Sequence, residues 1–221
     1  MQQELDLTKL YSQRFSELDL QKKNQIWKVL TKYFFQQWVT SNDTVVDIGA
    51  GYCEFINHIQ CKNKIAVDLN PAIKRFAHED VKIIYEPSSA MTSIASSSAQ
   101  VVFMSNFLEH LKSKDEVLET FSEARRILSP SGKLLILQPN IRFLSKSYWD
   151  FFDHHTPLSD ISLCEGLQLA GFQILKSYAQ FLPYTTKSKI PQFPFLVRLY
   201  LKFPLMWKLM GKQCCVVAEK S

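Results

Sequence analysis

The most constraining feature of this sequence is a series of short apolar runs, each followed by a turn or a helix-forming stretch. The runs are residues 44–48, 64–68, 81–85, 101–104 and 133–137. Strands that are apolar along their whole length are buried on both faces, as in parallel sheets covered by helices. The alternation therefore predicts an open α/β sheet with right-handed crossovers.

Hydrophobic periodicity predicts the helices around this sheet. Apolar residues recur at three-to-four spacing in 5–18 and 26–38, which indicates two N-terminal helices. Further helices are expected at 71–78, 114–128 and 159–170, and two late strands at 172–178 and 213–219. The turn at residues 130–132 should separate the helix at 114–128 from the strand at 133–137.

Composition limits the number of domains and the cellular setting. With 221 residues and 46% hydrophobic content, the chain can bury one sizeable core, so a single domain over 1–221 is expected. No signal-like N-terminus and no run of eighteen apolar residues occur, which predicts a cytoplasmic protein. The five cysteines match no zinc-binding spacing, and no metal site is predicted.

A glycine-rich loop, Gly49-Ala50-Gly51, directly follows the first apolar run. In open α/β sheets, ligands bind beyond the carboxyl ends of the strands, where such a loop lets them approach the backbone. A dinucleotide fingerprint requires a third glycine at position 54, which here is Glu54, and Asp47 lies just upstream. Two carboxylates repel a pyrophosphate, so a nicotinamide-dependent oxidoreductase is disfavoured.

A cofactor without phosphates and with positive charges fits this loop better. S-adenosylmethionine carries an ammonium and a sulfonium group, both of which gain from nearby carboxylates. Asp68 lies nineteen residues after Gly49, at the end of the second predicted strand. An acidic side chain at that place can accept hydrogen bonds from two ribose hydroxyls. The loop and Asp68 together predict S-adenosylmethionine as the cofactor.

Four separated motifs resemble the class I S-adenosylmethionine-dependent methyltransferases, of the type 11/12-like group. They are Val46-Asp47-Ile48-Gly49-Ala50-Gly51, Ala66-Val67-Asp68-Leu69-Asn70, Ser105-Asn106-Phe107-Leu108-Glu109-His110-Leu111 and Arg126-Ile127-Leu128-Ser129-Pro130-Ser131-Gly132. The resemblance covers roughly residues 44 to 140. It implies a Rossmann-like, seven-stranded, mostly parallel sheet whose last strand is antiparallel. It also implies an arrangement of N-terminal helices in 1–40, a cofactor-binding core in 41–140 and an acceptor side in 141–221.

The resemblance implies a role for each residue of the cofactor site. The methionine part of the cofactor would be held by Asp47, Gly49, Ala50 and Gly51, and the ribose by Asp68 with Leu69 beside it. Asn106 would flank the methyl group. Ser89 and Ala90 stand where the family often has an acidic residue before Ala, and they are candidates for contact with the adenine edge. Tyr11 and Arg14 could reach the cofactor carboxylate from an N-terminal helix.

Candidates for the catalytic base lie in two segments. A hydroxyl acceptor must lose a proton, and imidazole titrates near neutral pH. His110 follows the fourth predicted strand, whereas Asp153, His154 and His155 follow an aromatic stretch after residue 147. The same imidazoles could instead bond backbone groups in structural roles. Residues 148–158 also resemble a bacterial subgroup that modifies cell-surface glycans and small molecules.

The segment 184–212 has two interpretations. From residue 166 onward the chain carries eight basic residues against one acidic residue. Within 190–212, aromatic and aliphatic residues alternate with basic ones around Pro204. Such a segment is either a lid over the sheet or an amphipathic surface that contacts the inner face of an anionic membrane.

These patterns predict methyl transfer from S-adenosylmethionine to an oxygen or nitrogen atom of a small molecule, a sugar or a glycolipid. The main alternative is a non-enzymatic binding or regulatory module on the same fold, because fold alone does not establish activity. Nucleic-acid methylation is disfavoured, since Ser105-Asn106-Phe107-Leu108 stands where a base-flipping motif would be expected.

Overall fold

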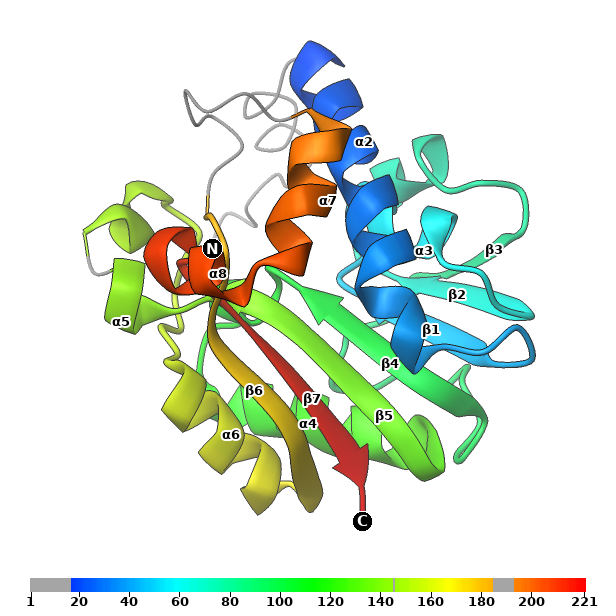
Figure 1. Ribbon diagram of the computed structural model, residues 1–221. Helices are drawn as coiled ribbons and strands as arrows, with labels where there is room; N and C mark the ends of the chain where they lie inside the picture. The colour runs from blue at the N-terminus through cyan, green and yellow to red at the C-terminus, as the bar shows by residue number, and fades with distance from the viewer. Residues whose placement is uncertain (1–16, 145, 185–192) are drawn as a thin grey trace.

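The computed structural model describes residues 17–144, 146–184 and 193–221, which form a seven-stranded sheet between layers of helices (Figure 1). The strands are β1 (Thr44–Ile48), β2 (Asn63–Val67), β3 (Val81–Ile84), β4 (Ala99–Ser105), β5 (Leu128–Pro139), β6 (Phe172–Leu182) and β7 (Gln213–Lys220). Their order is β3-β2-β1-β4-β5-β7-β6, and β7 runs antiparallel to both neighbours while the other pairs are parallel. The predicted Rossmann-like sheet is confirmed.

Helices cover both faces of the sheet. One face carries α2 (Glu17–Tyr33), α3 (Glu54–His58), α7 (Pro194–Lys202) and α8 (Pro204–Met210), and the other carries α4 (Lys114–Ile127) and α6 (Asp160–Leu169) (Figure 1). The shorter elements are η1 (Phe35–Trp38), η2 (Pro71–Arg75), η3 (Leu108–His110), α5 (Ile141–Leu144) and η4 (Ser147–Asp150). None of the helices in the described ranges is long and apolar enough to cross a bilayer.

The sheet is buried on both faces, as its apolar strands predict. Val46 and Ile48 of β1 pack into the core under α4 and α6, whereas Val45 packs into the core under α2. Successive side chains of a strand point to opposite faces, so one continuous apolar run supplies two cores. This double burial keeps β1 rigid up to the loop that follows it.

Several predicted elements differ from those observed. The first predicted helix lies largely outside the described residues, and α2 runs unbroken through 17–33 where two helices were expected to meet. The segment 71–78 forms only the 3-10 helix η2, started by the Asn70 side chain, which accepts from the amide of Ala72. The predicted turn at 130–132 lies within β5, where the pairing to β4 shifts and Ser131 has a positive φ of 58°.

Helices α7 and α8 lie between β6 and β7 in the sequence and fold back over the sheet, where α7 lies beside α2 and α8 packs against β6 (Figure 1). The indole of Trp207 is 8% exposed and packs against Phe34 and Phe181. The hydroxyl of Tyr200 donates to the carbonyl of Phe181 at 2.5 Å. These contacts anchor α7 and α8 at the edge of the cavity described next.

Candidate active site

A cavity of about 780 Å³ opens at the carboxyl ends of β1 and β4. Its floor includes the loop Gly49–Gly51 and the end of β4 at Ser105, and its walls come from α2 and from α7 and α8. The volume suits a ligand of cofactor size together with part of a second molecule. The position agrees with the rule that ligands bind at the carboxyl edge of an open α/β sheet.

Steric contact explains the glycine at the first turn of this loop. Gly49 has a φ of +68°, and a Cβ there would stand 2.2 Å from Cδ2 of Phe107. Its amide donates to the carbonyl of Val67 at 2.9 Å, which ties the loop to β2. Gly51 also has a positive φ, of +51°, but a Cβ there would meet only a carbonyl oxygen at 3.9 Å. Gly49 is therefore required by shape and backbone conformation, and Gly51 by conformation alone.

Asp68 is held in place by the loop itself. Its Oδ2 accepts from the amide of Gly51 at 2.8 Å, and its Oδ1 accepts from the amide of Asn70 at 2.8 Å. Each carboxylate oxygen keeps a further lone pair for a ligand hydroxyl. Burial raises the pKa of Asp68, although these two backbone hydrogen bonds oppose the change.

Three carboxyl groups, those of Asp47, Glu54 and Asp68, lie around the glycine loop. Burial, together with the charges of Glu54 and Asp68, holds the pKa of Asp47 well above its usual range. The Lys23 ammonium from α2 pairs with Glu54 at 3.0 Å and lies 5.2 Å from the centre of the Tyr52 ring. A cationic ligand would favour the ionised form of Asp47 and Asp68, whereas a pyrophosphate would be repelled by these carboxylates.

The other predicted cofactor residues lie at different distances from the cavity. Asn106 lines it, has a positive φ of 47° and keeps a buried Oδ1 without a hydrogen-bond partner among the described residues. A non-glycine residue in this conformation is often found at functional sites. Leu69 is 60% exposed beside Asp68. Ser89 and Ala90 follow β3 and are absent from the cavity lining, as is Asp68.

The predicted base candidates gather beside Asn106. The loop after η4 is bonded to η3, because the amides of His155 and Thr156 both donate to the carbonyl of Glu109, at 2.8 and 3.2 Å. This places Nδ1 of His110 3.1 Å from Oδ2 of Asp153. The His154 ring stacks on Phe151 and lies 5.1 Å from the ring of His110. His110 and His154 line the cavity, whereas Asp153 lies behind them and His155 is exposed.

The electrostatics of this group depend on a residue that was not predicted. Glu109 is 3% exposed, and burial raises its pKa to about 7, opposed by His110 and reinforced by Asp153. Burial lowers the pKa of His110, but the hydrogen bond to Asp153 and the charge of Glu109 outweigh it, so the net change is upward. Burial also raises the pKa of the nearby Tyr148 hydroxyl, as does the charge of Glu109.

Comparison with known proteins identifies the family. The methyltransferase-domain family matches residues 12–177, which is most of the chain. This chain belongs to that family. The methyltransferase uses S-adenosylmethionine, and the match favours an enzyme over both the binding module and the oxidoreductase.

Solved structures share the fold of this methyltransferase at low sequence identity. A methyltransferase from Archaeoglobus fulgidus superposes with a TM-score of 0.68 at 20% identity, covering 97% of this chain and 100% of that one. A methyltransferase from Thermotoga maritima superposes with a TM-score of 0.68 at 15% identity, and the match covers 97% of this chain and 96% of that one. The [4+2]-cyclase SpnF superposes with a TM-score of 0.61 at 14% identity, and the match covers 87% of this chain and 80% of that one. No curated protein matches the chain in sequence.

Some residues of the methyltransferase site were missed by sequence reasoning, and one pair lies outside the described residues. Glu109 was passed over because it precedes His110 in a segment interpreted as a helix start. Lys23 was missed because its helix carries no motif, and its contacts with Glu54 and the Tyr52 ring depend on the fold. Tyr11 and Arg14 fall outside the described residues.

Proposed function

We propose that this methyltransferase transfers the methyl group of S-adenosylmethionine to an oxygen or nitrogen atom of a small molecule, a sugar or a glycolipid. The observation that carries the proposal is the pair of imidazoles, His110 and His154, on the wall of the cavity beside Asn106. A hydroxyl or ammonium acceptor must lose a proton, and imidazole accepts one near neutral pH.

In the proposed arrangement, the cofactor lies along the glycine loop. Asp47 and the backbone of Gly49, Ala50 and Gly51 contact its methionine part, and Asp68 accepts from the ribose hydroxyls with Leu69 beside the adenosine. Ser89 and Ala90 border the adenine at the end of β3. The methyl group then lies near Asn106, whose buried Oδ1 has no hydrogen-bond partner in the described part of the chain.

The reaction is a direct displacement. A lone pair of the acceptor atom forms a bond to the methyl carbon while the carbon–sulfur bond breaks, and its electrons remain on sulfur. The sulfonium becomes a thioether, S-adenosylhomocysteine, and the acceptor proton passes to His154 or His110. The protein aligns the two reactants and limits the access of water.

The first test is calorimetry with S-adenosylmethionine and with S-adenosylhomocysteine. We expect Asp68→Ala to weaken binding about 10- to 150-fold, because a hydrogen bond to a charged group contributes about 1.5–3 kcal/mol. Asp80→Ala is the matched control, since Asp80 pairs with Lys64 at the opposite end of β3. Equal binding by wild type and Asp68→Ala would reject the placement of the cofactor.

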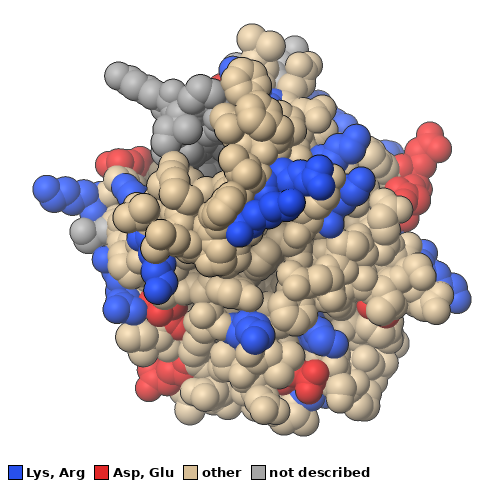
Figure 2. All heavy atoms as spheres, in the orientation of Figure 1, with Lys and Arg blue, Asp and Glu red and all other residues tan. Residues whose placement is uncertain are grey.

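The surface over α7 and α8 supports a lipid-linked acceptor. Leu199, Phe203, Leu205 and Met206 line the cavity and are also 50%, 54%, 71% and 38% exposed. Apolar surface therefore continues from the outside of the molecule into the cavity. Basic side chains gather over α7 and the adjoining part of α2 (Figure 2), and Arg198, Lys202, Lys208 and Lys212 are exposed. Such a surface suits the inner face of an anionic membrane.

Two assays separate the acceptor classes. With labelled S-adenosylmethionine and a total cell extract, a lipid-linked acceptor carries the label into the organic phase, whereas a free sugar or small molecule keeps it in water. We also expect the protein to sediment with vesicles of phosphatidylglycerol at low salt and to remain unbound with phosphatidylcholine. Absence of sedimentation with either vesicle at low salt would reject the membrane contact and leave α7 and α8 as a lid.

A further inference from the structure

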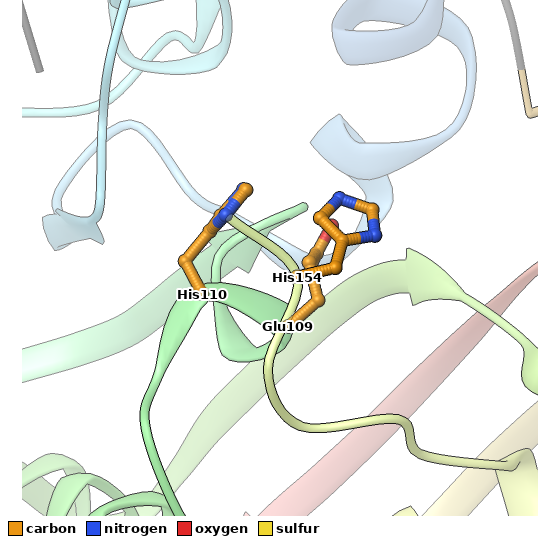
Figure 3. Close-up of side chains that lie close together, drawn as sticks. All are labelled: Glu109, His110 and His154. Carbon is orange, nitrogen blue, oxygen red and sulfur yellow. The ribbon is translucent and has the colours of Figure 1, made fainter. Parts of the chain in front are cut away.

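Three side chains that can bind a metal ion meet at the wall of the cavity. Figure 3 shows Glu109 and His110 rising from η3 and His154 reaching beside them from the loop after η4. One ligand atom from each lies within 4.8 Å of the others. All three residues also line the cavity. The set was not predicted because His154 is distant in sequence from Glu109 and His110, and the three residues match no zinc motif.

Glu109 is the residue that most needs a positive partner. Its side chain is buried, and its Oε2 has no hydrogen-bond partner among the described residues. No ion pair joins it to a Lys or Arg in the described ranges. An ionised carboxylate without a counter-charge is costly to bury, because it loses its hydration and gains nothing in return. A bound cation would remove that cost.

Hydrogen bonding prepares His110 as a ligand. Its Nδ1 lies 3.1 Å from Oδ2 of Asp153 and 3.1 Å from the carbonyl oxygen of Asp153. Both of these atoms are acceptors when the carboxylate is ionised, so the ring proton belongs on Nδ1 and Nε2 keeps its lone pair. A carboxylate behind a histidine in this way orients the ring and increases its basicity toward a metal.

Aromatic packing restricts the orientation of His154. Its ring stacks on Phe151 with centroids 5.0 Å apart and lies 4.7 Å from the centroid of Tyr148. The side chain is 7% exposed, so its position is set by these neighbours. A ligand held in a fixed orientation loses little conformational entropy when it binds an ion.

We infer that Glu109, His110 and His154 bind one divalent transition-metal ion, such as Zn²⁺, at the acceptor side of the cavity. Two imidazoles and a carboxylate suit Zn²⁺ and neighbouring first-row ions, whereas Mg²⁺ and Ca²⁺ prefer oxygen ligands. Zinc bonds of about 2.0–2.2 Å in a tetrahedral site put ligand atoms about 3.4 Å apart, so the side chains close by small rotations on binding. Three protein ligands leave one position open toward the cavity.

The ion would act on a hydroxyl acceptor, and this part of the inference rests on the proposed function. The acceptor oxygen takes the open position, where the positive charge lowers the pKa of its O–H group. The proton leaves to water, and the oxygen lone pair attacks the methyl carbon. The carbon–sulfur bond breaks, and its electrons neutralise the sulfonium. The products are the methyl ether, S-adenosylhomocysteine and one proton. When the ion is bound, His110 and His154 serve as its ligands, and the ion replaces the proton-accepting role that the proposed function gives to these imidazoles in the metal-free protein.

The test begins with metal binding in the full chain after treatment with a chelator. Calorimetry with Zn²⁺ and the visible absorption of added Co²⁺ should both report one ion per chain. We expect Glu109→Gln and His154→Ala each to lower the affinity at least about 100-fold, and Asp153→Asn to lower it about 10-fold through His110. Circular dichroism and the thermal midpoint verify that each variant is folded.

The matched control removes the exposed imidazole of His78, whose ring lies 6.5 Å from that of His58. His78→Ala should bind Zn²⁺ as wild type does. Two results would overturn the inference. One is wild type that binds neither ion after chelation. The other is binding of Zn²⁺, one ion per chain, at a different place: it would persist in both Glu109→Gln and His154→Ala, or it would be lost in His78→Ala.

Binding of S-adenosylmethionine to metal-free protein separates this inference from the proposed function. We expect Glu109→Gln to lose Zn²⁺ and keep the cofactor, and Asp68→Ala to lose the cofactor and keep Zn²⁺. If wild type binds Zn²⁺ and not the cofactor, the proposed function fails and the metal site stands. If methyl transfer to a hydroxyl acceptor is unchanged by the chelator, the catalytic part of the inference fails.

Discussion

The two sides of the cavity are built in different ways. On the cofactor side, Asp47, the glycine loop and Asp68 lie at the ends of two adjacent strands, and the backbone amides of the loop donate to Val67 and to the Asp68 carboxylate. On the acceptor side, two backbone hydrogen bonds join η3 to the loop after η4, but the rings of that loop and the helices α7 and α8 are held by side-chain packing between distant parts of the chain. The cofactor side should therefore be sensitive to backbone changes and the acceptor side to the loss of buried side chains.

The largest effect is expected at the anchor of the acceptor side. Trp207→Ala removes a buried indole that packs against Phe34, Tyr178 and Phe181. Truncation of a buried Trp costs about 3–5 kcal/mol of folding free energy. Urea unfolding measures the loss. If the difference between the two sides is real, the remaining folded protein should keep its affinity for S-adenosylmethionine. A parallel loss of cofactor affinity would contradict it.

The second effect tests the backbone of the cofactor side. Gly49→Ala forces a side chain against Phe107 at a positive φ, and Gly51→Ala imposes only the backbone strain. We expect a loss of about 2–5 kcal/mol for Gly49→Ala, the sum of left-handed strain and overpacking. Gly51→Ala should lose about 1–2 kcal/mol. Equal losses in urea unfolding would show that the contact with Phe107 relaxes without cost.

The third effect concerns Asp47, where stability and binding should change in opposite directions. Its pKa is raised in the folded state, so its contribution to stability is present below its ordinary pKa and is lost as pH rises. Asp47→Asn should therefore raise the thermal midpoint of the cofactor-free protein at neutral pH. The same change should weaken binding of S-adenosylmethionine about 10- to 150-fold.

Thermal melts of wild type and Asp47→Asn between pH 4 and pH 8, with calorimetry on both, measure these changes. The melting difference between the two proteins should grow as pH rises. A lower midpoint for Asp47→Asn at every pH would mean that the carboxylate is structural, and the contrast with the acceptor side would be weaker.

The smallest effect on folding is expected on the exposed face of α8. Leu209 is 73% exposed, so Leu209→Ser should change the free energy of unfolding by no more than about 0.5 kcal/mol. It should nevertheless reduce sedimentation with phosphatidylglycerol vesicles. Unchanged vesicle binding by Leu209→Ser would show that the exposed face of α8 does not contact the membrane.

The same contrast explains what could be predicted from the sequence. Both ends of strand β1 were predicted correctly. The apolar run that forms the strand and the glycine turn that ends it lie within a few positions of each other in the sequence. Helix α4 was predicted to within one residue, since Ser113 caps its start and its apolar face is periodic. The glycine loop and its link to Asp68 belong to the same local pattern.

The elements that were missed depend on contacts between distant residues. Strand β6 extends to Leu182 because it pairs with β7, and no local sequence pattern indicates that the strand continues so far. The segment after Asn70 has helical periodicity, but it makes only a 3-10 helix. Glu109 became a candidate only when the fold brought His154 beside it.

The position of β7 has a consequence for how the chain acquires its fold. β7 follows every other strand in sequence, yet it pairs with β5 on one side and β6 on the other. During synthesis, β5 and β6 therefore emerge with unpaired edges and have no common partner until residues 213–220 leave the ribosome. Exposed strand edges of this kind promote association with other chains. The yield of soluble protein should thus depend on how fast the final segment inserts, and slow insertion would favour aggregation.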